Sequence, residues 1–297
     1  MINKILSLWR KLGSNKPDDV IPIGWSGDFT SWEDAKLKCS GYDDRVILEK
    51  CKNSLLQVKN GDAVYERDSV LFDEVQYNWS LLSVIRLIAE ENENTLSLVD
   101  FGGSLGSSYF QNKELLSDLK RVSWSIIEQQ HFVECGKEYF QSEDLKFYFS
   151  IEDSIAKHSP KVLLLSCVLP YVESPFELLA FLNQLRIDFI ILDRTPFINF
   201  DRSLITIQRV PPEIYDASYP AWFFNKKELL KPLTNYKQLT EFDSYCDADH
   251  VIATDITASW SGMVLQHKDA RSTLDEKNLA FKMKEIKQRY LDVVIKE

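Results

Sequence analysis

The sequence has little that would support a metal site, a disulfide framework or a nucleic-acid surface. Of its 297 residues, five are cysteine and four are histidine. The cysteines are scattered without a Cys-x-x-Cys pair, and the histidines lack metal-ligand spacing. We therefore expect no metal, no disulfides and a reducing, cytoplasmic location. The net charge is −10 with no long run of Lys or Arg, so we expect no nucleic-acid partner.

Long apolar runs, internal repeats and low-complexity tracts are also missing. No run approaches the roughly 20 residues of a membrane-spanning helix, and the N-terminus lacks the apolar core and cleavage site of a signal peptide. What is present is typical of a soluble protein with a sizeable core: 44% hydrophobic and 27% charged residues. The length allows one large domain or two small ones.

The N-terminal third reads as helices around an aromatic loop. Residues 2–12 place apolar side chains at helical spacing beside Lys and Arg, so they could touch a membrane surface, although a helix packed on the protein is preferred. With a linker they form the segment 1–19. Residues 20–94 are expected to form a helical cap: a turn-rich aromatic loop at 24–35, in which Ser31 and Asp34 resemble a capping box, then helices at 43–60 and 71–89.

Residues 95–297 alternate between strand and helix patterns, which indicates an α/β domain with a parallel sheet. An aromatic and proline-rich insertion follows the fifth strand, with Leu204–Gln208 as a short extended piece. A terminal antiparallel pair is expected after it. The expected strands are 96–101, 123–128, 145–149, 161–167, 187–193, 236–244 and 259–267. The expected helices are 106–119, 130–140, 151–158, 174–185, 225–233 and 275–295.

The chain is organised around the stretch Leu96–Phe110. An apolar strand ends in Asp100, a turn with Gly102, Gly103 and Gly106 follows, and a helix begins. Glycines let the backbone bend tightly and approach a ligand closely, as in α/β nucleoside sites. The next strand ends in Glu128, whose carboxylate can accept hydrogen bonds from both ribose hydroxyls. Together these features predict a ribose-bearing ligand.

Two classes of enzyme use this arrangement, NAD(P)-dependent oxidoreductases and S-adenosylmethionine-dependent methyltransferases. The glycines give G-G-x-x-G rather than the dinucleotide pattern G-x-G-x-x-G. Asp100 at the strand end suits a cationic ligand, because its charge would face phosphate in a dinucleotide site. The residues therefore favour the methionine derivative, whose ammonium Asp100 can orient directly or through water.

This order, with Asp-x-Gly at 100–102, Glu128 and the terminal strand pair, resembles class I methyltransferases. More narrowly, the segments Gly24–Ala35, Asp100–Gly106 and Pro211–Phe224 are similar to a bacterial methyltransferase family often associated with surface-polysaccharide gene clusters. The resemblance covers roughly residues 20–268. It implies a Rossmann-like sheet of five parallel strands plus a C-terminal pair with an antiparallel strand, and S-adenosylmethionine as cofactor, with S-adenosylhomocysteine as product.

Position by position, the resemblance implies a set of cofactor-binding residues. Ser104 stands at the middle glycine of the family's loop, which is a departure from the pattern. Ser150 and Ile151 match the positions that flank the adenine, and Ser166 and Cys167 match those beside the transferring methyl. The complete expected set is Asp100, Gly102, Gly103, Ser104, Gly106, Glu128, Gln129, Ser150, Ile151, Ser166 and Cys167.

Methyl transfer to a hydroxyl needs alignment and a base, but no metal. Asp193, at the end of the fifth strand, is the candidate catalytic base, and Tyr171 is a second candidate catalytic residue that could line the acceptor pocket. Arg194 could hold an anionic group, or it could form a local ion pair that closes the strand. Tyr215, Tyr219 and Trp222 are expected to bind substrate, because aromatic faces stack on sugar rings, although a core role is equally compatible.

The expected function is methylation of a hydroxyl on a small-molecule, sugar or glycan precursor, and the glycan part comes from the resemblance. Two alternatives stay open, an NAD-dependent oxidoreductase and a non-catalytic scaffold that keeps the fold. The sequence leaves the acceptor and the oligomeric state undetermined.

Overall fold

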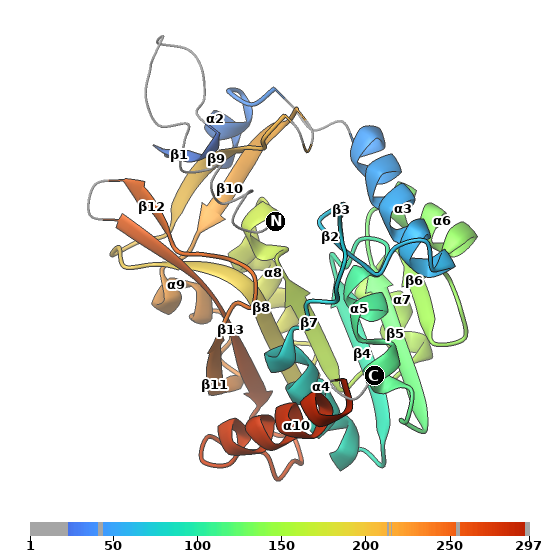
Figure 1. The fold of residues 1–297 in the computed structure, drawn as a ribbon. Coiled ribbons are helices and arrows are strands. Elements are labelled where there is room, and N and C mark those ends of the chain that lie inside the picture. The colour runs from blue at the N-terminus through green and yellow to red at the C-terminus, as the bar shows by residue number, and fades with distance from the viewer. Residues whose placement is uncertain (1–22, 41–43, 213, 215, 254–255, 295–297) are drawn as a thin grey trace.

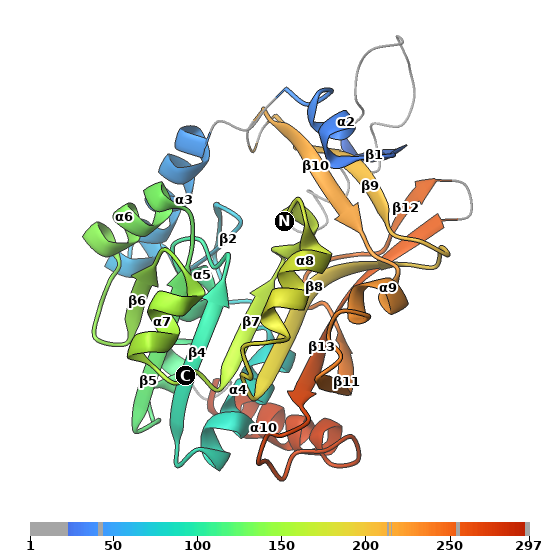
Figure 2. The ribbon, with the colours of Figure 1, turned by 180° about the vertical axis from the view of Figure 1, so that it is seen from behind.

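In the computed structural model, residues 23–40, 44–212, 214, 216–253 and 256–294 are described (Figures 1 and 2). The amphipathic segment expected at 2–12 and its linker lie outside these residues. In the part of the chain that is described, no helix is long and apolar enough to cross a membrane.

A mostly parallel sheet forms the centre of the molecule, and its strand order is β6-β5-β4-β7-β8-β13-β11. Strands β4 to β8 run parallel to one another, and β13 is antiparallel to its neighbours β8 and β11. The short strand β12 also pairs with β13. This is the Rossmann-like class I methyltransferase sheet that was predicted. Its strands are β4 (Thr95–Phe101), β5 (Arg121–Ile127), β6 (Leu145–Tyr148), β7 (Val162–Ser166), β8 (Phe189–Ile198), β11 (Tyr236–Asp243), β12 (His250–Ala253) and β13 (Ile256–His267).

Helices cover both faces of this sheet, because alternate strand residues point to opposite faces. Leu98 and Leu164 contribute to the core on one face, and Val99 and Leu163 contribute to the core on the other. On the first face lie α3 (Asp44–Asn60), α4 (Trp79–Glu91), α5 (Ser107–Asn112), η1 (Glu114–Leu116), α6 (Gln130–Tyr139) and α10 (Leu279–Val294). On the second lie α7 (Ile151–Lys157), η2 (Leu169–Tyr171), α8 (Pro175–Leu182) and α9 (Lys226–Leu230).

A second, three-stranded antiparallel sheet lies above the carboxyl ends of the parallel strands (Figure 1). It consists of β1 (Gly24–Phe29), β9 (Leu204–Arg209) and β10 (Ser218–Phe223), with β9 in the middle. The helix α2 (Trp32–Lys36) packs against it. The sequence reading gave a loop at 24–35 and one extended piece in the later insertion. In neither segment do apolar and polar residues alternate regularly. The pairing of β1 with β9, about 180 residues apart, therefore depends on tertiary contacts.

The segment 20–94 is more varied than an all-helical cap. Ser31 caps α2 by accepting a hydrogen bond from the backbone N–H of Asp34 at 3.1 Å, as expected. The helix expected at 71–89, however, begins only at Trp79. Residues Val70–Phe72 instead form β3, paired with β2 (Tyr65–Arg67) in a hairpin. The expectation of a longer helix arose because Leu71 and Val75 fall at helical spacing before Trp79.

The fifth strand of the domain is also longer than its sequence suggested. β8 continues past Asp193 to Ile198, because β13 pairs along this extension, from Ser261 opposite Thr195 to Ala258 opposite Ile198.

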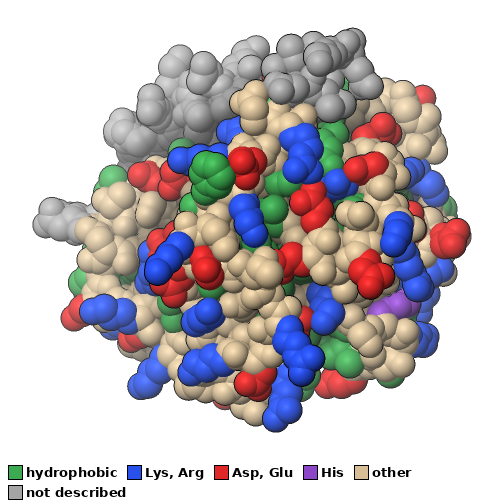
Figure 3. All heavy atoms as spheres, turned by 90° about the horizontal axis from the view of Figure 1, so that it is seen from below, with side chains coloured by type: hydrophobic (Ala, Val, Ile, Leu, Met, Phe, Trp, Pro, Cys, Tyr) green, Lys and Arg blue, Asp and Glu red, His purple; other side chains and the backbone are tan. Residues whose placement is uncertain are grey.

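Acidic and basic side chains are interspersed on the face at the amino ends of the parallel strands (Figure 3). On this face the net negative charge is not gathered into one acidic patch.

Candidate active site

A cavity of about 1200 Å³ lies at the carboxyl ends of β4, β5, β7 and β8, beneath the three-stranded sheet. Most of the sequence-predicted residues line it, although they are spread over 120 positions of the chain. Those in its wall are Asp100, Gly102, Gly103, Ser104, Glu128, Gln129, Ser166, Cys167, Tyr171, Asp193, Arg194 and Tyr219.

The glycine turn after β4 has the geometry of a ligand-binding loop. Gly102 has φ +73°, and a Cβ at this position would lie 2.3 Å from Cγ2 of Val168. A Cβ on Gly103 would lie 2.5 Å from the carboxyl carbon of Asp100. Gly106, with φ +105°, is the N-cap residue of α5. Ser104 adopts φ +53°, a left-handed conformation that favours glycine. This agrees with its place at the middle glycine of the family's loop. The backbone therefore passes closely over Asp100, which only glycine at position 103 allows.

Asp100 lies at the base of this loop and is 1% exposed. Its Oδ2 accepts a hydrogen bond from the indole N–H of Trp124 at 3.1 Å. Burial raises the pKa of Asp100 to about 7, against the effect of the Trp124 hydrogen bond, and the charges of Glu128 and Asp193 act in the same direction as burial. A cation at this place would favour the ionised carboxylate.

Glu128 follows β5 and faces the same loop. Its Oε1 accepts from the backbone N–H of Ser104 at 3.3 Å, and its Oε2 accepts from the backbone N–H of Gln129 at 2.8 Å. Burial raises the pKa of Glu128, and these two hydrogen bonds oppose the rise. Each carboxylate oxygen has a second lone pair, so Glu128 keeps the capacity to accept from two hydroxyl groups.

The residues expected beside the adenine are placed differently. Ser150 caps α7 by accepting a hydrogen bond from the backbone N–H of Asp153 at 3.1 Å, and Ile151 is buried in the core of the second face. Neither is part of the cavity wall. Phe149, one position earlier and 51% exposed, lines the cavity together with Phe132. The helix start at Ile151 turns residues 150 and 151 away from the cavity, so they do not lie in its wall as the resemblance implied.

Asp193 lies in the wall near the end of β7 and is fully engaged. Its Oδ2 accepts from the hydroxyl of Ser166 at 2.7 Å, and both of its oxygens accept from Nδ2 of Asn78 at 3.1 Å. Burial raises the pKa of Asp193 despite these hydrogen bonds and the nearby Arg194.

Cys167 has φ +53°, and burial raises the pKa of its thiol, so it stays protonated.

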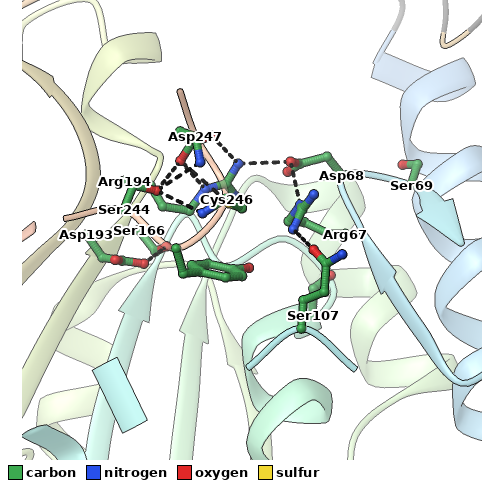
Figure 4. A network of polar contacts seen from close by, with 12 residues as sticks. Arg67, Asp68, Ser69, Ser107, Ser166, Asp193, Arg194, Ser244, Cys246 and Asp247 are labelled. Atoms are coloured by element: carbon green, nitrogen blue, oxygen red, sulfur yellow. Dashed lines mark hydrogen bonds and ion pairs between the residues drawn. The ribbon is translucent and has the colours of Figure 1, made fainter. Parts of the chain in front are cut away.

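Arg194 belongs to an ion-pair network rather than to a pair with Asp193 (Figure 4). Its Nε and Nη2 donate to the two carboxylate oxygens of Asp247 at 2.9 and 3.2 Å, and Nη2 also donates to Asp68 at 3.0 Å. Burial disfavours its charge, but Asp68 and Asp247 hold the pKa of Arg194 well above its usual value. The local ion pair expected of Arg194 is therefore not the one observed, since its partners Asp68 and Asp247 lie far away in the sequence.

The aromatic residues divide between the cavity and the core. Tyr171 donates its hydroxyl to Gln208 at 2.8 Å, and its ring packs edge-on against Tyr219 at 5.4 Å between centroids. Both line the cavity. Trp222 stacks on Phe224 at 6.1 Å in the core and is not part of the cavity wall. In β10, Trp222 and Tyr219 are three positions apart and face opposite sides. Tyr215 lies outside the described residues.

Sequence reasoning missed several polar wall residues from the N-terminal segment and the C-terminal pair. Asn78, Glu66 and Asp247 have no local motif that marks them, because each reaches the cavity through tertiary packing. Glu66 is 3% exposed and accepts hydrogen bonds from the Ser107 hydroxyl and the Ser69 backbone N–H. Burial raises the pKa of Glu66 to about 7.

Among the residues that are described, no group of three or more His, Cys, Asp and Glu side chains could hold a metal ion.

Comparison with solved structures finds remote similarity. An S-adenosylmethionine-dependent methyltransferase from Clostridium acetobutylicum is 11% identical, with a TM-score of 0.41, over 73% of this chain and 99% of that one. MtNAS in complex with MTA and tNA is 10% identical, with a TM-score of 0.40, over 75% of this chain and 70% of that one. LepI in complex with SAM is 10% identical, with a TM-score of 0.33, over 59% of this chain and 43% of that one.

No family model and no curated protein matches the sequence. The three structures share 10–11% identity with this chain and superpose loosely, with TM-scores below 0.5. The strand order is that of the Rossmann-like class I methyltransferase fold. The pocket at the carboxyl edge of its sheet is acidic and glycine-rich.

Proposed function

We propose that this protein is an S-adenosylmethionine-dependent methyltransferase. The observation that carries the proposal is the placement of Glu128 and Asp100 on either side of one glycine loop, at the wall of one cavity. Glu128 can accept from ribose hydroxyls, and Asp100 offers a carboxylate where a ligand's ammonium group would be stabilised. A diphosphate over the glycine loop would be repelled by an ionised Asp100, which argues against the dinucleotide alternative.

The loop fits this ligand because it leaves no side chain over Asp100. Gly103 stands where any Cβ would collide with the carboxyl group of Asp100. Exposed Gln129 and the ring of Phe149 lie on the Glu128 side of the cavity and are the candidate contacts of the adenine. Ser166, the last residue of β7, and Cys167, which follows it, stand on the opposite side, toward Asp193.

The cofactor supplies an electrophilic methyl group, and the chain must orient an acceptor and remove its proton. Asp193 is the candidate base, since burial raises its pKa and it lines the cavity. It would take the proton of an acceptor hydroxyl as the oxygen forms its bond to the methyl carbon. Asn78 and Ser166 hold the carboxylate in place, while Tyr171 and Tyr219 present aromatic edges and faces for the acceptor.

A sugar or glycan acceptor, as the resemblance implies, is compatible with these aromatic side chains. This part of the proposal is tested after the cofactor. Purified protein with tritiated S-adenosylmethionine would be offered sugar nucleotides and glycan precursors, and Asp193→Asn should reduce transfer while leaving the cofactor affinity within about twofold.

The first experiment is a calorimetric titration with S-adenosylhomocysteine, with NAD as the parallel ligand. Micromolar binding of the former and none of the latter is expected. Glu128→Gln should weaken binding by about tenfold or more, since it removes charge-assisted hydrogen bonds to the ribose. Glu134→Gln is the matched control, because Glu134 is exposed on α6 and lies outside the cavity wall. Equal affinity of the Glu128 variant and the parent would overturn the assignment.

One observation favours the scaffold alternative. The oxygens of Asp193 already accept three hydrogen bonds, with which the hydroxyl of an acceptor would have to compete. A scaffold predicts cofactor binding without methylated product from any acceptor offered. The binding titration and the transfer assay therefore separate the two functions.

A further inference from the structure

We propose that the acceptor carries an anionic group, a phosphate or a carboxylate, which binds between the guanidinium groups of Arg67 and Arg194 in the place that Asp68 takes in this structure. That the anionic ligand is a methyl acceptor rests on the proposed function, whereas the anion site itself rests on geometry alone.

The two arginines come from different elements and meet at one wall of the cavity. Arg67 ends β2 and Arg194 belongs to β8, and both line the cavity. Their side chains are 15% and 12% exposed. Oδ2 of Asp68 lies 3.0 Å from Nη2 of Arg194 and 4.0 Å from Nε of Arg67. Figure 4 shows Asp68 reaching from its turn toward both guanidinium groups. One carboxylate oxygen therefore bridges two largely buried cations.

The charges around this bridge leave Arg67 dependent on Asp68. Arg194 has a second carboxylate, Asp247, on its other side. The other contacts of Arg67 are neutral: it donates to Oε1 of Gln76 at 2.7 Å and stacks over the rings of Phe72 and Tyr245. Within the described part of the chain, Asp68 is the carboxylate that pairs with Arg67. Without Asp68, the two guanidinium groups would share the charge of Asp247, with Glu66 nearby but without an ion pair to either arginine, a situation that still attracts an anion.

Asp68 is suited to being displaced. Its side chain is 63% exposed although that of Arg194 is 12% exposed, so water can solvate the Asp68 carboxylate when it leaves the arginine. It stands with Ser69 in the two-residue turn between β2 and β3, with φ values of +51° and +65°. The turn is fixed by other contacts, since the Ser54 hydroxyl donates to the Ser69 carbonyl at 2.9 Å. The Asp68 side chain can therefore swing out while the turn stays. A phosphate or carboxylate that binds an arginine through two oxygens would replace it.

The test is a titration of inorganic phosphate and of acetate into the protein, with and without saturating S-adenosylhomocysteine, at constant ionic strength set with chloride. Asp68→Asn should bind the anion roughly five- to tenfold more tightly than the parent, because the internal competitor is gone. Asparagine also tolerates positive φ, so the turn is kept. Adding Arg67→Gln to this variant should abolish the gain. Stronger phosphate than acetate binding indicates a phosphorylated acceptor, and the reverse order indicates a carboxylated one.

Asp28→Asn is the matched control, because Asp28 pairs with exposed Arg202 outside the cavity wall. Equal anion affinity in the parent and Asp68→Asn, or an equal gain in Asp28→Asn, would overturn the proposal. The outcome is separate from the cofactor question: anion binding without S-adenosylhomocysteine binding would keep the site and refute methyl transfer, and the opposite result would refute the site alone.

Discussion

The side-chain amide of Asn78 donates to both carboxylate oxygens of Asp193, at 3.1 Å each. Its own oxygen accepts from the backbone N–H of Leu81, which makes Asn78 the N-cap of α4. One buried residue therefore starts a helix of the N-terminal segment and also positions a carboxylate of the central sheet, 115 positions away. This contact joins the two parts of the chain at the cavity.

Asn78→Asp should destabilise the protein at neutral pH. The variant keeps a side-chain oxygen for the cap but loses both hydrogen bonds to Asp193 and places two carboxylates together. We expect the free energy of unfolding to fall by about 1–3 kcal/mol at pH 7. The loss should shrink at pH 5, where one carboxyl of the pair is protonated. Chemical denaturation at the two pH values measures both effects.

The control for this change is Asn225→Asp, at the N-cap of α9, where the amide instead donates to a backbone carbonyl, that of Phe200. The new carboxylate there does not replace a hydrogen bond to another carboxylate, so its effect should vary much less between pH 5 and 7 than that of Asn78→Asp. A pH-independent loss in Asn78→Asp would contradict the repulsion argument.

Gly102→Ala should be much more damaging than Gly61→Ala. Both glycines have positive φ, +73° and +82°, so alanine costs about 1–2 kcal/mol of backbone strain at either position. Only at 102 would the new Cβ meet a side chain, Val168, at 2.3 Å, while nothing lies within 4 Å at 61. Thermal unfolding should show at least twice the loss at 102, together with weakened S-adenosylhomocysteine binding. Equal effects of the two substitutions would mean that the close approach at Gly102 is not tight.

Binding of S-adenosylhomocysteine should strengthen with rising pH because of Asp100. Its pKa without ligand is about 7, so about one tenth of the carboxyl groups are ionised at pH 6 and about nine tenths at pH 8. Since the ligand's ammonium binds the ionised form, affinity should rise about tenfold over this range. Asp100→Asn, which can still accept from Trp124, should bind more weakly and with a flatter pH profile. A variant that keeps the full slope would assign the dependence to another group.

The Glu66 carboxyl should make the protein less stable as the pH rises. Burial lifts its pKa from the ordinary 4.5 to about 7 in the folded state. A raised pKa gives stability that is fully present below pH 4.5 and is lost as the pH rises through 7. Glu66→Gln should therefore flatten the decline in melting temperature between pH 4.5 and 8. Glu276→Gln, at an exposed position, is the control and should change nothing. A parallel decline in all three proteins would exclude Glu66 as the cause.

Part of the cavity wall follows from local sequence patterns. Asp100, Glu128 and Asp193 each come at or just after an apolar run, and parallel strands bring such positions to one edge of a sheet. That rule places them together without knowledge of packing. The same rule covers Phe149, which follows β6 directly and lines the cavity, whereas Ser150 and Ile151 were expected there from the resemblance and instead begin α7. It does not extend to side chains supplied by irregular segments.

The sequence by itself determined the order of the five parallel strands and the helices between them, the glycine loop and the acidic residues at the strand ends, because these depend on short-range periodicity and on the backbone freedom of glycine. Only the tertiary structure decided that β1 pairs with β9, that Asn78 holds Asp193, and that Arg194 meets Asp68 and Asp247. It also decided that Trp222 belongs to the core while Tyr219 faces the cavity. These outcomes depend on contacts between residues far apart in the chain, whose partners no local pattern specifies.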